Sequence, residues 1–482
     1  MKYVASIGLE AHAQLATRTK MFCGCTTKFG EAPNVQTCPV CIGMPGVLPV
    51  PNRTAIEFAL RVALALHCRI DRLTFFDRKN YYYPDLPKNY QISQSHSNLG
   101  SDGWAEIDVD GEPLRVGIGN VHLEEDAGKL IHSEAPGSNH SEVDLNRTGT
   151  PLLEIVTAHP PDMHSAAQVE AYMNTLQSML LYMGVSDCKM QEGSLRFEAS
   201  VSVAPEGAAE LGPRCEIKNL NSVKAVLKAI DYEIGRQTGV LESGGHNEQE
   251  TRLWDDLRNV SARMRRKEGS ADYRYFPEPD LPPIEITDEM LAAARASLPE
   301  FAGERRKRFV SQYGLPSYDA GVLVDNRAVA DYFEELAALS NDPKLASNWM
   351  MTEVMRAFNE RKVTIQELRR AVSPQRLADL VAQIRAGTIS NNTAKDVFGQ
   401  MLESGEDAKT IIDKKGLRQI SDAGELDGIV DKVLAENPGA VSDYKAGKEA
   451  ALKWLMGQIM RQTRGKANPQ VIGKLLAEKL TR

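Results

Sequence analysis

Strict two-residue alternation near the N-terminus is the feature that most constrains the fold. From residue 7 to residue 15 every second side chain is apolar, and the run ends in Leu15. The positions between them carry Glu10, His12 and Gln14. Successive side chains of a strand point to opposite faces. The pattern therefore predicts a β-strand with one apolar face and one face that carries chemically active groups.

Two later segments repeat this alternation. In residues 194–203 the polar face carries Arg196, Glu198 and Ser202, and farther along the chain Lys218 follows the same rule. Antiparallel sheets often have one packed and one solvated face, so a single strand of this kind proves little. Carboxylates, an imidazole and cations repeated over several strands favour a functional site on the open face of an antiparallel sheet.

Composition divides the chain into three parts. Residues 1–293 are rich in glycine, proline and alternating segments, and they include the proline-rich stretch 275–283. Residues 294–405 change to short amphipathic helical segments, and residues 406–482 continue as a helical tail after a Ser-Gly-Glu break. We expect an α+β fold in which a first domain with an antiparallel sheet precedes an all-helical middle domain and a small helical tail domain.

The tail is basic in an acidic protein. The chain has a net charge of -8, whereas residues 444–482 hold nine Lys and Arg against two Glu. Five apolar residues of the tail recur at helical spacing and predict a small core: Leu452, Trp454, Leu455, Met456 and Ile459. Such a charge run is usually a solvated helix face. The functional alternative is an electrostatic contact with a nucleic-acid backbone.

Four of the seven cysteines crowd together near the N-terminus. They form two close pairs separated by twelve residues: Cys23, Cys25, Cys38 and Cys41. Two short-spaced pairs can supply the four thiolates of a tetrahedral zinc ion, and four cysteine ligands leave no open coordination position. We therefore predict a structural Zn²⁺ site in preference to four unligated thiols.

An acidic cluster adds to the polar face of the predicted sheet. It contains Glu124 and Glu125, which together with Glu10 and His12 offer the oxygen and imidazole ligands that suit Mg²⁺. No apolar run approaches the roughly 18 residues of a membrane span, and the N-terminus has no signal-peptide pattern. We expect a cytoplasmic protein without a membrane partner.

The block 77–94 combines aromatic residues, prolines and charges, as rigid binding loops do. Some of its tyrosines are expected to pack on the core, but Lys79 and Asp85 are candidates for binding. The sequence contains neither a GxxxxGK[ST] loop nor a strand-following GxGxxG loop for phosphate. A nucleotide would therefore be held by metal, Lys and Arg on the open face.

A series of motifs, in order over nearly the whole chain, resembles the GatB family, the B subunits of the aspartyl/glutamyl-tRNA(Asn/Gln) amidotransferases. The motifs are GLEAH (8–12), the block 77–94, HLEEDAGK (122–129), NRTGTPLLEIV (146–156), EGSLR (192–196), EIKNLNS (216–222), DYRYFPEPDLPP (272–283), YKAGK (444–448) and RGKANP (464–469). The resemblance implies a cradle-shaped catalytic domain, a helical domain and a tail domain that contacts tRNA.

The resemblance also implies a reaction. ATP would phosphorylate the side-chain carboxylate of misacylated Asp-tRNA(Asn), Glu-tRNA(Gln) or both, and ammonia would then attack the activated carboxylate. The chain has no amidase-like Ser-Ser-Lys arrangement, so the ammonia is expected from a glutaminase partner. The implied partners are the amidase (glutaminase) subunit of the same amidotransferase, its small third subunit and the misacylated tRNA.

Three groups of residues follow from these motifs. The expected Mg²⁺ ligands are Glu10, His12, Glu124 and Glu125. The expected phosphate-neutralising cations are Lys79, Arg196 and Lys218, with Asp85 assigned to nucleotide binding beside Lys79 and Arg196. Further catalytic candidates are the carboxylates Glu154, Glu192 and Glu198.

Two segments depart from the family pattern. The family usually carries Asp-Ala-Asn where this chain has Glu198, Ala199 and Ser200, and a larger residue than Ala13 is common after His12. Two other function classes compete. A free-standing ATP-dependent carboxylate–amine ligase has no use for the basic tail, and a zinc-stabilised tRNA-binding protein without chemistry has no use for the Glu/His/Lys face.

Overall fold

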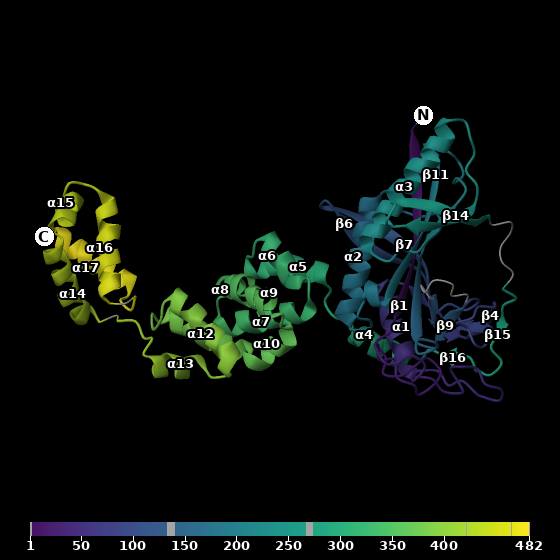
Figure 1. Cartoon of the computed structure of the whole chain (residues 1–482), viewed down its shortest axis with the longest axis horizontal. Coiled ribbons are helices and arrows are strands. Elements are labelled where there is room, and N and C mark those ends of the chain that lie inside the picture. Colours follow the sequence, from purple (N-terminus) through teal and green to yellow (C-terminus); the bar gives the residue numbers. More distant parts are fainter. Residues whose placement is uncertain (1, 133–139, 267–272, 421, 464, 482) are drawn as a thin grey trace. The chain divides into compact units, whose positions relative to one another are not determined.

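The computed structural model describes residues 2–132, 140–266, 273–420, 422–463 and 465–481. The chain divides into two compact units, Met1–Phe301 and Ala302–Arg482. Strands occur in the first unit, whereas the described elements of the second unit are all helices (Figure 1). This mixed architecture, with an antiparallel-dominated sheet followed by helices, confirms the predicted fold class.

A 12-stranded sheet is the centre of the first unit. Its order is β14-β13-β12-β11-β1-β10-β7-β5-β4-β15, with β6 paired to β7 and β2 to β6. Neighbours run antiparallel except for the parallel pair β12 and β13. The strands are β1 (Tyr3–Gln14), β2 (Arg69–Ile70), β4 (Asp77–Asn80), β5 (Tyr90–Ser93), β6 (Gly100–Val109), β7 (Glu112–Glu125), β10 (Pro151–Thr157), β11 (Leu195–Pro205), β12 (Cys215–Lys218), β13 (Glu250–Asp255), β14 (Val260–Arg266) and β15 (Phe276–Pro277).

Helices pack on the apolar side of this sheet (Figure 1). Helix α3 contacts β11, α2 contacts β6, and α1 contacts both β6 and β7. Two short two-stranded sheets complete the unit, one of β3 and β16 and one of β8 and β9. These elements are α1 (Arg53–Ala65), α2 (Ala166–Met183), the 3₁₀ turn η1 (Met190–Glu192), α3 (Val223–Glu242), α4 (Asp288–Ala296), β3 (Leu73–Thr74), β8 (Lys129–His132), β9 (Ser141–Asp144) and β16 (Ile284–Glu285).

The alternation predicted for the first strand is confirmed. Ile7, Leu9 and Ala11 are 0 to 1% exposed and belong to the core of this unit. Glu10 and His12, on the opposite face, keep partial exposure. One position on β11 differs from the expected exposed face: Ser202 is buried, and its hydroxyl donates a hydrogen bond of 2.7 Å to the carbonyl of Gly212, whose segment lies against it.

The second unit contains two separate apolar clusters, one between Phe309 and Ile412 and one between Leu426 and Leu480. The domain boundaries at residues 293 and 405 stay predictions. The elements are α5 (Ala302–Tyr313), α6 (Ser317–Val324), α7 (Arg327–Ser340), α8 (Pro343–Trp349), the π-helical turn η2 (Met350–Val354), α9 (Met355–Arg361), α10 (Ile365–Ala371), α11 (Pro374–Arg385), α12 (Asn391–Ser404), α13 (Ala408–Lys415), α14 (Ala423–Glu436), α15 (Pro438–Lys445), α16 (Glu449–Gln462) and α17 (Pro469–Thr481).

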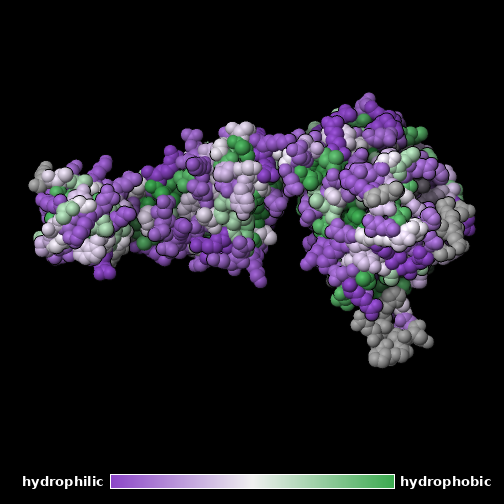
Figure 2. Space-filling model, turned by 90° about the horizontal axis from the view of Figure 1, so that it is seen from above, coloured by the Kyte–Doolittle hydropathy of each residue, from purple (hydrophilic) through white to green (hydrophobic). Residues whose placement is uncertain are grey.

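The predicted core of the tail is right for some of its residues and wrong for Trp454. Leu455 and Ile459 are fully buried, four residues apart on one side of α16, and Ala451 continues the same row. Trp454 precedes Leu455 by one residue, which rotates it off this row, and it is 47% exposed. None of the described helices has both the length and the apolar character needed to cross a membrane. Hydrophilic residues cover much of the face shown in Figure 2.

Candidate functional site

Four neighbouring strands of the large sheet carry a row of charged side chains across its open face. His12 on β1 lies directly opposite Glu154 on β10 and opposite Arg196 on β11. Glu154 in turn lies opposite His122 on β7. Directly paired residues of antiparallel strands share a face, so the sheet register alone brings these four side chains together.

Three side chains of this face form a compact group with the ligand types of a cation site. One ligand atom each of His12, Glu124 and Glu154 lies within 4.8 Å of the others. The His12 Nε2 atom is 3.5 Å from Glu154 Oε2 and 3.9 Å from Glu124 Oε1. His122 Nε2 approaches the same Glu154 oxygen at 3.1 Å. Two carboxylates and one imidazole at these separations fit a hard divalent cation such as Mg²⁺.

The electrostatics of this group follow from burial and mutual contact. Burial alone would lower the pKa of His12, but the hydrogen bond and charge of Glu154 and the charge of Glu124 raise it to about 9. Burial works in the opposite direction on Glu154, yet hydrogen bonds from His12 and His122 hold its pKa well below the usual range. The pKa of Glu124 is raised by burial and by the neighbouring Glu154. His12 therefore balances negative charge that a bound cation would balance in its place.

Glu10 lies one register step from this group. It is paired with Val156 on β10 and with Glu198 on β11, on the same face as His12. Burial, followed by the charges of Glu154 and Glu198, raises its pKa. Glu10 is not one of the three residues whose ligand atoms converge.

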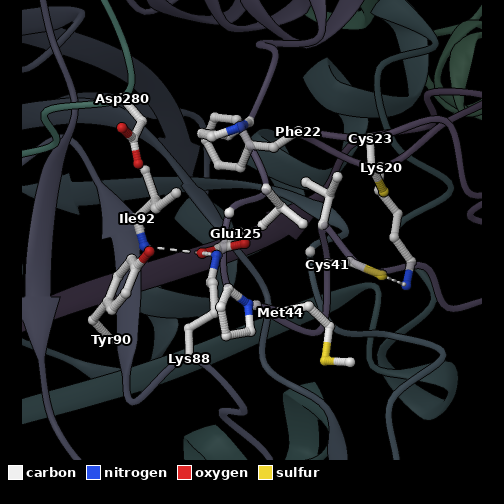
Figure 3. A pocket seen from close by; sticks show the side chains of 17 residues that line it. Lys20, Phe22, Cys23, Cys41, Met44, Lys88, Tyr90, Ile92, Glu125 and Asp280 are labelled. Carbon is white, nitrogen blue, oxygen red and sulfur yellow. Dashed lines mark hydrogen bonds and ion pairs between the residues drawn. The ribbon is translucent and has the colours of Figure 1, made fainter.

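Glu125 has different partners from Glu124. Its carboxylate is buried, pairs with the Lys88 ammonium and accepts a hydrogen bond of 3.0 Å from the Ile92 backbone N–H. The pair lines a cavity of about 220 Å³ that also borders the cysteine loop. Figure 3 shows the lining side chains. The structure therefore places Glu125 outside the convergent group, and the metal set that the geometry favours is His12, Glu124 and Glu154.

Two of the cations expected at the phosphate, Arg196 and Lys79, lie beside this group. Arg196 Nη2 is 3.1 Å from Asp126 Oδ1, and Gln14 donates a hydrogen bond of 2.8 Å to the other oxygen of that carboxylate. Burial opposes the charge of Lys79, but Glu124 and Glu154 raise its pKa.

The Lys79 ammonium also lies 5.4 Å from the ring centre of Tyr273 and 5.9 Å from that of Tyr81. Such contacts fix a cation in place without neutralising it. Lys79 is therefore held beside the carboxylates with its charge available to a ligand.

The remaining candidates lie at or beyond the edge of this group. Lys218 forms an ion pair with Glu198 of 2.5 Å on the neighbouring strands. Glu192 pairs with Lys189 at 3.0 Å in the turn η1. The backbone carbonyl of Asp85 accepts a hydrogen bond of 2.8 Å from Gly128 N, which ties the loop after β4 to the end of β7.

Several residues of the site were not nominated from the sequence. His122 precedes Glu124 by two residues, so strand alternation alone would have put it on the same face. Asp126 lies in the HLEEDAGK motif next to Glu125, and its three contacts with Gln14, Arg147 and Arg196 appear only in the folded sheet. Lys88 carried no local signal beyond its place in the block 77–94.

The four clustered cysteines converge in the loop after β1. One sulfur atom of each lies within 4.8 Å of the others. A hydrogen bond from Cys23 lowers the pKa of Cys41 to about 4, and Lys20 acts in the same direction. Burial raises the pKa of Cys25 to about 11. Sulfurs around a tetrahedral zinc sit roughly 3.8 Å apart, given Zn–S bonds of about 2.3 Å, so this donor set fits zinc.

Comparisons with known proteins agree over the whole chain. Residues 5–292 match the family model described as the GatB/GatE catalytic domain, and residues 331–480 match the GatB domain. The B subunit of the aspartyl/glutamyl-tRNA(Asn/Gln) amidotransferase from Moorella thermoacetica is 52% identical over 480 residues, covering 100% of both chains. The protein of the same name from Carboxydothermus hydrogenoformans is 51% identical over 482 residues, or 100% of this chain and 99% of that protein.

Proposed function

The chain belongs to the GatB family, the B subunits of aspartyl/glutamyl-tRNA(Asn/Gln) amidotransferases, and from this membership we propose how its open sheet face carries out the reaction. As a member it is part of a glutamine-dependent tRNA amidotransferase, an enzyme that forms a carbon–nitrogen bond. The proposed chemistry is transfer of a phosphoryl group from ATP to the side-chain carboxylate of the tRNA-borne Asp or Glu, followed by attack of ammonia.

One observation carries this proposal. His12, Glu124 and Glu154 converge on the open face, beside Arg196 and Lys79. A carboxylate is a poor electrophile, and phosphoryl transfer to it depends on positioning and on neutralising phosphate charge. Acidic cation ligands next to fixed cations are the arrangement that such a transfer requires.

The chain's own residues take distinct parts in the proposed reaction. His12, Glu124 and Glu154 would hold Mg²⁺, and Glu10 borders them. When bound, this ion neutralises charge on the phosphates during transfer. Lys79 and Arg196 orient the phosphate oxygens by charge and by the planar fork of the guanidinium.

The outer candidates have supporting parts. Lys218, paired with Glu198, lies at the edge of the face. Asp85 fixes the loop that follows β4, the strand that carries Lys79. Glu192 and Glu125 act at a distance from the convergent group. They would contribute to catalysis indirectly, by holding neighbouring segments in position: Glu192 through Lys189, and Glu125 through Lys88.

The partners follow from the chemistry and from the family. Ammonia is the second substrate, and the amidase (glutaminase) partner would release it from glutamine, with the small third subunit bracing the pair. An activated carboxylate is prone to hydrolysis, so ammonia delivered from a bound partner protects the intermediate. The misacylated tRNA would contact the basic tail. The proposed substrate is an aminoacyl-tRNA used in translation, which supports a cytoplasmic location.

A structural zinc ion is part of the same proposal. Cys23, Cys25, Cys38 and Cys41 would bind it, supported by their convergence and by the thiolate character of Cys41. Four sulfur ligands complete the coordination shell, so the ion would stabilise the loop and take no part in chemistry.

A reconstitution assay tests the proposed function. The purified chain, with and without its partner subunits, is incubated with ATP, ammonium and either Asp-tRNA(Asn) or Glu-tRNA(Gln). We expect amide on the tRNA-borne amino acid together with stoichiometric ADP. Amidation of the free amino acid without tRNA would instead indicate a carboxylate–amine ligase. Binding of tRNA without ATP-dependent amide formation would indicate a binding protein without chemistry.

A further inference from the structure

A fully buried lysine lies beside the cysteine cluster. Lys20 follows β1 by a few residues and is 1% exposed. Its ammonium donates hydrogen bonds to the Gln36 carbonyl at 2.7 Å, to the Leu145 carbonyl at 3.4 Å and to Cys41 Sγ at 3.6 Å. Figure 3 shows the side chain reaching along the cavity wall with its nitrogen at the Cys41 sulfur. Burial of an ammonium group is costly unless an opposite charge lies close by.

The usual opposite charge is missing. In the part of the chain that the structure describes, no carboxylate oxygen lies within 4.0 Å of the Lys20 nitrogen. Two carbonyl oxygens satisfy hydrogen bonds but carry no net charge. The sulfur of Cys41, 3.6 Å from the Lys20 nitrogen, is the contact that can carry a negative charge, as it does when it binds a metal ion.

The proposed zinc site would supply that charge in full. Four thiolates around one divalent ion carry a net charge of about −2, and a closed protein site cannot offset it with water. A buried ammonium that donates an N–H···S hydrogen bond to one ligand offsets part of it. Residues that hydrogen-bond to metal ligands orient them and tune the affinity of the site.

Lys20 also connects the cysteine loop to the catalytic face. Its backbone N–H donates to the Cys25 carbonyl at 2.9 Å, within the loop, while its ammonium reaches Leu145 on the segment that leads into β10. The neighbouring residue Met21 donates a backbone hydrogen bond of 2.7 Å to the Gly149 carbonyl on the same segment. That segment precedes the strand that carries Glu154.

We propose that Lys20 is a positioning residue of the metal centre: its ammonium fixes the Cys41 thiolate, compensates the charge of the four-cysteine site and anchors the loaded loop against residues 145–149. The proposal rests on the zinc site proposed above. It predicts that zinc is held more tightly than four thiolates alone would hold it.

Competition for zinc tests this in the full chain. The comparison is between Lys20→Met, which removes the charge at similar volume, and Lys28→Met, an exposed lysine of the same loop that pairs with Glu31. Zinc-loaded proteins are mixed with a chromogenic chelator. We expect Lys20→Met to lose affinity by about 10–100-fold, the usual effect of removing a partner of a metal ligand, while Lys28→Met matches the unsubstituted chain.

Two further measurements separate charge compensation from simple loss of fold. Lys20→Arg keeps the charge and the N–H donors, and we expect it to restore most of the affinity. In the cobalt-loaded chain, loss of the N–H···S bond makes the Cys41 thiolate more electron-rich, so Lys20→Met should shift the sulfur-to-cobalt charge-transfer band to lower energy. Where Lys20→Met does not fold in excess zinc, Lys20→Gln takes its place in both measurements.

The outcomes are distinguishable. Zinc affinity and cobalt spectrum unchanged in Lys20→Met would overturn the role of Lys20 and leave the zinc site standing. An unsubstituted chain that contains no zinc when prepared without chelator would overturn the zinc site and this inference together. Neither result bears on ATP-dependent amidation, which the reconstitution assay measures separately.

Discussion

His12 Nε2 lies 3.5 Å from Glu154 Oε2, although the two residues belong to strands far apart in the sequence. The antiparallel register of β1 and β10 sets them directly opposite each other. Glu124 then reaches the same imidazole nitrogen from β7 at 3.9 Å. The proposed cation site is therefore built by three strands. Substitution of any of its three residues should weaken the same reaction on the open face.

Arg196 provides the first prediction. Its guanidinium contacts Asp126 through Nη2, and its other N–H groups are donors in the same plane. A lysine at this position keeps the charge but loses these planar donors. We expect Arg196→Lys to lower the rate of ammonium-dependent amidation by about 100–1,000-fold, the range seen when one donor to a developing charge is lost. Thermal unfolding should change little. Full activity in single-turnover assays of this variant would remove Arg196 from the phosphate-binding set.

The buried Lys88–Glu125 pair allows a prediction about stability. Removal of one partner leaves an uncompensated charge, so Lys88→Met should destabilise the chain by about 3–5 kcal/mol in urea unfolding. The double variant Lys88→Met/Glu125→Leu should recover most of this loss, because it leaves no charge unpaired. Lys28→Met, at an exposed ion pair, serves as the control and should leave stability unchanged. Equal stability of the single and double variants would mean that the pair is not buried in solution.

The sequence predicted the faces of the sheet better than the site built on them. Alternation in residues 7–15 was sufficient to place His12 on the open face, because side-chain direction along a strand is a local property. Which strand lies next to it is set by the whole sheet. The contact of His12 with Glu154, and the separate pairing of Glu125 with Lys88, therefore had no local signal.

The cysteine cluster and the tail show the same limit. Short spacing brought Cys23 near Cys25 and Cys38 near Cys41, and the structure unites the two pairs. The buried lysine beside them was invisible, since its burial depends on the distant segment that contains Leu145. In the tail, five of the eight residues 452–459 are apolar and were predicted to form a core. One side of a helix cannot bury all five, and Trp454 is the one left exposed.

Zinc binding gives the third prediction. Metal analysis of the full chain, purified without chelator, should find about one zinc per chain, as one closed four-cysteine site requires. Cys38→Ser should lower the unfolding temperature or the soluble yield more than it lowers the specific activity of the surviving enzyme. Zinc absent from the unsubstituted chain would refute the site. A specific activity that falls in proportion to zinc would give the metal a part in chemistry.

The tail gives the fourth prediction. Deletion of residues 444–482 would remove α16 and α17 and expose the apolar residues of α14 that pack against them. Substitution of exposed cations is therefore the cleaner test. The triple variant Lys453→Ala/Arg461→Ala/Lys466→Ala alters exposed residues only. We expect weaker tRNA binding and a salt dependence flattened by about 0.7–0.9 per lost phosphate contact.

Turnover at saturating tRNA should be nearly unchanged in this variant, because backbone contacts add affinity without chemistry. The measurement is a set of tRNA binding isotherms at several salt concentrations, on the assembled complex. Unchanged affinity and unchanged salt slope would make the basic tail a solvated surface.

The most direct test of the account compares amidation by His12→Ala and Glu124→Gln with that by Glu206→Gln, an exposed carboxylate just beyond β11 that pairs with Lys2. Each is assayed in the assembled enzyme with glutamine and, separately, with free ammonium as the nitrogen donor. Loss of a cation ligand removes several kcal/mol of charge stabilisation, so both site variants should lose about 100-fold or more in rate with either donor, while Glu206→Gln keeps full activity. Near-normal ammonium-dependent activity in the two site variants would contradict the assignment of this face to carboxylate activation.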